Sequence, residues 1–154
     1  MHLGKRQLPS FISNIKYLIM GAWGHTNFDN DTALDFIGDV EEEGIDRIVS
    51  AIDVINTIEE DAYVDADLAT EALAAIEYIA TAKDRMAEDF PEDAADWVKS
   101  HKAQLLIIRG IVGKSQRAID RIKNNSELKE LWEETEDFEK WNNVLDDLNT
   151  RISS

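Results

Sequence analysis

Apolar residues recur every three or four positions along most of the chain, which is the spacing of amphipathic helices. This spacing is clear in the stretches that begin at Leu34 and at Ile45, and again between Phe138 and Ile152. The segment 68–82 is apolar on almost every side, so it is expected in the middle of a bundle. No stretch alternates apolar and polar residues as a strand would. The sequence therefore predicts an all-α bundle of about six to seven helices, with mostly antiparallel packing and no sheet of consequence.

Several predicted helix starts carry a side chain that can accept hydrogen bonds from the first free backbone amides. The candidates are Asp29, Asn30 or Asp31, then Asp65 or Asp67, then Asp89 ahead of Glu92 with Pro91 between them, and finally Ser126. Gly44 fits a helix end between the first two helices. The apolar spacing from Leu105 to Ile122 predicts one continuous helix across that stretch.

The chain has 154 residues, of which 44% are hydrophobic and 31% charged, as in a single globular domain. We expect one α-helical domain over 20–154 and an N-terminal extension over 1–19 that can form a short helix. Cysteine is absent, which excludes disulfides and a thiolate nucleophile. The three histidines are scattered, so we expect no metal site and no cofactor. A cytoplasmic location is the simplest expectation.

The formal net charge of −16 is unevenly distributed. Residues 20–98 carry 22 acidic and three basic side chains, whereas residues 99–123 carry one acidic and seven basic ones. So acidic a body repels nucleic-acid phosphates and anionic membranes, and its expected partner is a protein with a basic surface. The basic run 99–123 is either an internal counter-charge or a separate contact patch. The oligomeric state is not predicted.

Two motifs have simpler structural explanations. "GIVGKS" (110–115) ends like a phosphate-binding loop, but Ile108 stands where that motif requires glycine. We interpret it as part of a helix whose two glycines permit close packing. Asp29 and Asp31 fit the first positions of a calcium-binding loop, but Ala33 does not continue it. Helix capping is the preferred explanation.

Glu77 lies within the apolar stretch 74–80, so its carboxylate is expected to be buried. A buried carboxylate must be paired or hydrogen-bonded. It is either a catalytic acid with a raised pKa or a structural anchor that receives amides of the "GAWG" loop or an arginine such as Arg109. We favour the anchor. His25 lies near several carboxylates and is a candidate for acid–base chemistry, although a lone loop histidine more often has no such role.

The stretch "MGAWGHTNFDNDTALDF" (20–36) resembles the opening of a bacterial family known as domain of unknown function 4259. The later segments "FPEDAADW" and "SELKELWEE" are similar to other parts of that family. The resemblance covers 20–154, implies a small helical domain and brings no assigned activity. The residues that carry the candidate signature, structural or functional, are Trp23, Gly24, His25, Phe28, Asn30, Asp31, Asp35 and Glu77. Trp23 and Phe28 are expected to pack into the bundle.

Two functions compete. The first is a non-enzymatic interaction protein, for example an immunity or antitoxin protein that binds a basic partner. The alternative is a hydrolase or small-ligand-binding protein that uses Glu77, His25 and the carboxylates between Asp29 and Asp35. That alternative requires these side chains to converge on a pocket.

Overall fold

The protein is described by a computed structural model that covers residue 22 and residues 24–154. Within this part the chain forms seven helices, and its β-pairing is one isolated bridge between Ala22 and Asn30. The predicted all-α, single-domain fold is confirmed. The extension predicted over 1–19 lies outside the described residues, and so does Trp23.

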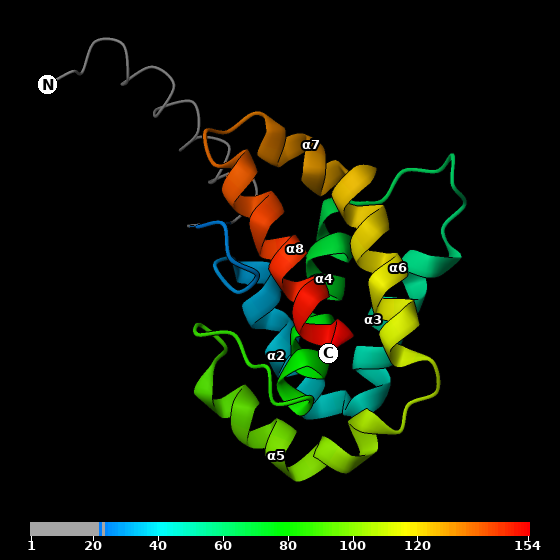
Figure 1. The fold of residues 1–154 in the computed structure, drawn as a ribbon, viewed down its shortest axis with the longest axis vertical. Coiled ribbons are helices and arrows are strands. Elements are labelled where there is room, and N and C mark those ends of the chain that lie inside the picture. The colour runs from blue at the N-terminus through cyan, green and yellow to red at the C-terminus, as the bar shows by residue number, and fades with distance from the viewer. Residues whose placement is uncertain (1–21, 23) are drawn as a thin grey trace, which may run out of the picture.

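The helices follow one another with short connections, and α4 occupies the centre of the bundle (Figure 1). In chain order they are α2 (Asp31–Glu43), α3 (Ile45–Thr57), α4 (Ala66–Ala82), α5 (Glu92–Leu106), α6 (Ile111–Asn124), α7 (Glu127–Glu133) and α8 (Phe138–Ser153). Helices α5 and α7 lie at opposite ends of the bundle, with α7 near the start of α4. The candidate site described below lies at the α7 end.

Helix α4 forms the core because its sequence offers apolar side chains in every direction. Every residue from Ala72 to Ala80 is buried, and α4 contacts each of the other six described helices. The other helices bury one apolar stripe each; in α8 this stripe includes Trp141, Leu145 and Leu148. The central position predicted for this segment is confirmed.

Three predicted helix caps are present. Asn30, Asp65 and Ser126 each accept a hydrogen bond from a backbone amide in the first turn, at 2.7, 2.8 and 3.1 Å. Gly44 ends α2 with a φ of 77°, a backbone conformation that glycine adopts without steric cost. The cap predicted at Asp89 is wrong.

Helix α5 begins at Glu92 after Pro91, whose fixed φ suits a helix start and which contributes no side-chain hydrogen bond. Asp89 instead accepts a hydrogen bond of 2.6 Å from the hydroxyl of Thr26. It therefore connects the loop before α5 with the loop before α2.

The single helix predicted across 105–122 is also wrong, because α5 ends at Leu106 and α6 begins at Ile111. Gly110 has a φ of 67° in the left-handed region, which breaks the helix between them. The close packing expected at the two glycines is absent. A Cβ at Gly110 would meet nothing within 4 Å, and one at Gly113 would lie an ordinary 3.5 Å from Arg117.

Candidate functional site

The loop before α2 is held by hydrogen bonds among its own residues. Asn30 caps α2 with its Oδ1 and donates from Nδ2 to the carbonyl of Asn27 at 3.3 Å, while the Asp29 amide donates to the Thr26 carbonyl at 3.1 Å. A Cβ at Gly24 would lie 2.3 Å from Asp29 Oδ2, so glycine is needed there for space. Within this loop, Gly24 and Asn30 have structural roles.

Phe28 anchors this loop in the core. Its ring is 4% exposed and meets the edge of Phe90, with the ring centroids 5.3 Å apart. Phe90 in turn packs edge-on against Tyr78 of α4 at 5.3 Å. The packing predicted for Phe28 is confirmed, whereas that of Trp23 concerns a residue outside the described part.

Glu77 is buried at 2% exposure, as its apolar neighbours predict. Its Oε1 accepts a hydrogen bond from Arg151 Nη1 at 2.8 Å. Its Oε2 accepts one from Arg151 Nη2 at 3.0 Å and one from Asn27 Nδ2 at 2.8 Å. The arginine expected here was Arg109, but the partner is Arg151 of α8, and the loop contributes an asparagine side chain rather than backbone amides. Arg109 is exposed instead.

Arg151 has a partner for each of its three guanidinium nitrogens. In addition to the two hydrogen bonds with Glu77, Nε donates to Asp147 Oδ2 at 2.7 Å, and Nη1 donates to the Arg85 carbonyl at 3.0 Å. Burial favours the neutral guanidine, but the hydrogen bonds and negative charges of Glu77 and Asp147 outweigh it and raise the pKa of Arg151. Arg151 and Glu77 therefore form a fixed ion pair that joins α8 to α4.

Among the described candidates for catalysis, His25, Asp31 and Asp35 form no hydrogen bond with the Glu77 carboxylate. Asp31 and Asp35 are exposed on α2, and His25 lies in the loop beside a small hollow. Asn27, which covers Glu77, lines that hollow. Among the described residues, no three histidine or carboxylate side chains group as ligands for a metal ion.

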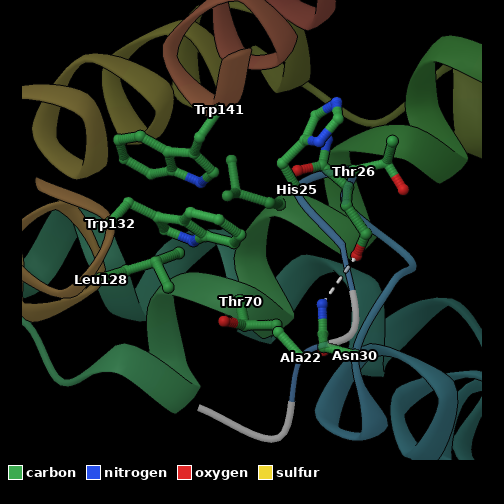
Figure 2. A pocket seen from close by; sticks show the side chains of 10 residues that line it. Ala22, His25, Thr26, Asn30, Thr70, Leu128, Trp132 and Trp141 are labelled. Carbon is green, nitrogen blue, oxygen red and sulfur yellow. Dashed lines mark hydrogen bonds between the residues drawn. The ribbon is translucent and has the colours of Figure 1, made fainter. Parts of the chain in front are cut away.

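This inner hollow has a volume of about 30 Å³, room for about two water molecules. Trp132 of α7 and Trp141 of α8 line one side, and His25 and Thr26 lie opposite (Figure 2). It is too small for a substrate, since ligand pockets measure roughly 300 to 1,000 Å³.

A second hollow, of about 300 Å³, opens between the start of α4 and α7. It shares Thr70 and Leu128 with the inner hollow, so the two are neighbours. We call this larger hollow the α4–α7 groove. Its lining consists of Asp65, Ala66, Asp67, Thr70, Glu127, Leu128 and Leu131. Three of these residues are acidic and none is basic.

The walls of the α4–α7 groove are tied to each other. The amide of Ala66 donates to Glu127 Oε1 at 2.8 Å, and the amide of Glu127 donates to the carbonyl of Val64 at 2.9 Å. Arg121 of α6 holds the preceding loop through the carbonyls of Glu59, at 2.9 Å, and of Ala62, at 2.7 Å. The groove is therefore part of the rigid bundle.

Tyr63, in the loop before α4, is 59% exposed. Its hydroxyl donates to Glu130 Oε1 at 2.9 Å. That hydrogen bond, followed by partial desolvation and the charges of Glu127, Glu130 and Asp65, raises the pKa of Tyr63 to about 12. The shift therefore reflects mainly the hydrogen bond with Glu130.

A larger hollow, of about 550 Å³, lies between the end of α4 and α5. Its lining includes apolar Phe90 and Val98, but also charges of both signs, and Lys102 is paired with Asp84 at 2.6 Å. This mixed lining gives it no clear preference for a cationic or an anionic ligand.

Several basic side chains of the run 99–123 form contacts with other parts of the same chain. Lys114 pairs with Asp53 at 3.5 Å, Lys123 pairs with Asp146, and Arg121 binds backbone carbonyls. These contacts match the counter-charge interpretation for those three side chains. They leave the acidic surface at the α4–α7 groove without a basic side chain in its lining.

The comparisons with known proteins agree with the motif. The family described as domain of unknown function (DUF4259) matches residues 21–144, and the chain belongs to that family. No curated protein and no solved structure matches the chain. In the described part, no helix is both long and apolar enough to cross a membrane.

Sequence reasoning missed three residues that shape this region: Asn27, Arg121 and Arg151. Asn27 lies inside the recognised motif, and the only feature in the sequence that indicated a hydrogen-bonding role was its amide side chain. Arg151 lies 74 positions from Glu77, and Arg121 binds carbonyls about 60 positions away, so no local pattern relates them to their partners.

Proposed function

We propose that this protein is a non-enzymatic interaction protein that binds a basic protein partner, with an immunity or antitoxin role as its most concrete form. The observation that carries the proposal is the contrast between Glu77 and the α4–α7 groove. Both oxygens of the buried carboxylate accept hydrogen bonds from Arg151 and Asn27, whereas Asp65 and Asp67 of the groove are exposed in a chain with a net charge of −16.

The same contrast counts against the hydrolase or small-ligand alternative. A general acid must reach the proton that it transfers, but Glu77 lies under Asn27 and bonds both oxygens inside the protein. His25 forms no hydrogen bond with Glu77, and Asp31 and Asp35 are exposed on α2.

Charge complementarity mainly speeds association, because a surface of one sign steers a partner of the opposite sign. We expect the purified protein to retain a basic protein from an extract of its native host at low salt and to release it at high salt. The retained protein is then identified, purified and mixed with this chain. Its association rate should fall steeply between about 0.05 and 0.3 M NaCl, as the Debye length shortens.

A control variant tests whether the net charge of the protein, rather than the groove, determines binding. A variant with three α2 carboxylates neutralised (Glu41→Gln, Glu42→Gln and Glu43→Gln) makes the net charge less negative by three while leaving the groove intact. It should slow association modestly without abolishing the complex. A partner that is neutral or acidic, or a complex whose association ignores salt, would contradict the proposal.

A further inference from the structure

Helix α5 packs mainly against α4 and lies at the edge of the bundle, so one of its faces is uncovered (Figure 1). We infer that this face binds a second copy of the chain, with the two α5 helices side by side and antiparallel about a twofold axis. Each copy then inserts the exposed apolar end of its α5 into the hollow of about 550 Å³ beside the α5 of the other copy. We call this the α4–α5 hollow.

The uncovered face of α5 runs along the α4–α5 hollow and continues to the end of the helix. Four of the helix residues that line the hollow recur at steps of three and four positions: Glu92, Ala95, Lys99 and Lys102. Leu106 is the next residue in this series, so it lies on the same face. Leu106 is 46% exposed, and Ile107 after it is 81% exposed. An aliphatic pair is therefore left in solvent at the end of the helix that forms one wall of the hollow.

The α4–α5 hollow offers apolar surface to such a pair. Its lining includes Phe90 and Val98, which are buried, and Met86, which is 52% exposed. Its volume lies within the range of roughly 300 to 1,000 Å³ that holds drug-sized ligands, so it has room for two aliphatic side chains. Filling it removes apolar surface of both copies from water, which is favourable in proportion to the area buried.

The apolar end and the hollow lie on one helix, at a separation that suits a twofold axis. Ile107 follows Ala95 by about three helical turns. When two such helices lie antiparallel, the Ile107 of each copy reaches the Ala95 of the other, and the axis passes near His101. Such an isologous contact is complete with two copies, so it produces a closed dimer rather than a growing chain.

The charges along α5 also fit an antiparallel pair. Its first turn is acidic, whereas Arg109 is exposed just beyond its end. With Ile107 opposite Ala95, Arg109 lies beside the first turn of the second copy, where Glu92 lines the hollow. The two copies of Lys102 meet near the axis, but each is balanced by Asp84 at 2.6 Å. The contact thus carries both signs, although the whole chain has a net charge of −16 and repels itself elsewhere.

Sedimentation equilibrium of the full chain, from about 5 to about 500 µM, measures the association. One pair of helices gives an interface below about 1,200 Å², so we expect a dimer that dissociates on dilution within this range. Ile107→Asp should make the chain monomeric throughout, because it places two carboxylates in apolar hollows. Leu34→Asp, the matched change at a 42% exposed position on α2, should leave the dimer unchanged. Circular dichroism and the melting temperature verify that both variants are folded.

The antiparallel geometry is tested by two charge reversals, Arg109→Glu and Glu92→Arg. Each variant alone sets like charges against each other twice in its dimer, which should weaken association by about tenfold or more. An equal mixture of the two variants should recover a dimer close to wild type in affinity. In the mixed dimer the two substituted side chains face each other, and so do the unsubstituted Arg109 and Glu92.

Three results overturn the assignment: a wild-type chain that is monomeric at the highest concentration, a dimer that persists in folded Ile107→Asp, or a mixture of the folded charge variants that stays monomeric. A host protein that binds a monomeric chain and is lost with Ile107→Asp would assign the surface to that protein instead. The proposed function is judged separately, by the salt-dependent complex with a basic partner.

Discussion

The Glu77–Arg151 pair can be tested most sharply by removing each partner in turn. Glu77→Leu leaves the guanidinium, whose side chain is 15% exposed, without the carboxylate that it grips with both terminal nitrogens. Arg151→Leu leaves a carboxylate with 3% exposure and one remaining donor, Asn27. Each change strands a buried charge.

The expected magnitude follows from these contacts. Breaking a buried ion pair from one side costs about 3–5 kcal/mol, so each single variant should lose that much free energy of unfolding. The melting temperature should then fall by about 6 to 20 °C for a chain of this size. Glu77→Gln should lie between wild type and Glu77→Leu, because its amide oxygen keeps an acceptor for Asn27 or Arg151 but places a donor against a donor.

The double variant Glu77→Leu/Arg151→Leu removes both charges together. Its main remaining penalty is the orphaned Asn27 amide, about 1–3 kcal/mol, so it should be more stable than either single variant. Urea unfolding followed by far-ultraviolet circular dichroism measures all four proteins, with equal m-values as the check on two-state behaviour. Single variants within about 0.5 kcal/mol of wild type, or a double variant that equals their sum, would refute the buried-pair reasoning.

Three further predictions concern single positions. Asp84, two residues after the end of α4 at Ala82, has a φ of 64°. Asp84→Gly should therefore be about 1 kcal/mol more stable than Asp84→Ala in urea unfolding. Both variants lose the Lys102 pair, and equal stabilities would contradict the strain. Tyr63 should ionise near pH 12, and Glu130→Gln should lower that pKa in an absorbance titration. Because the folded pKa is the higher one, its stabilising effect is complete below about pH 10 and is lost as the pH rises through about 12. Trp23→Ala should lower unfolding stability by about 3–5 kcal/mol if the indole is a core contact; an unchanged melting temperature would assign Trp23 to binding.

The helices were predictable because their signals are local. The apolar stripe of each helix and the caps at Asn30, Asp65 and Ser126 depend on residues within one or two turns. The break between α5 and α6 was missed for the same reason. Ile108 continues the helical spacing, and a glycine such as Gly110 looks alike in sequence whether it is helical or left-handed.

The candidate site was less predictable, because it depends on contacts between distant segments. Burial of Glu77 followed from its apolar neighbours, but Arg109 and Arg151 were equally available in sequence as its partner. The α4–α7 groove exists because α7 returns to the start of α4, where the amide of Ala66 meets Glu127, 61 positions later. Charge composition predicted an acidic surface, yet it could not locate a groove on it.

The family motif reaches the inner hollow at Asn27. This side chain, 5% exposed, donates to Glu77 and also lines the inner hollow next to the groove. Phe28, Ala33 and Phe36 of the same motif are buried, so these side chains dock the loop and α2 on the bundle. A change at Glu77 should also disturb the inner hollow through Asn27, which is why binding by such variants must be compared at temperatures where each remains folded.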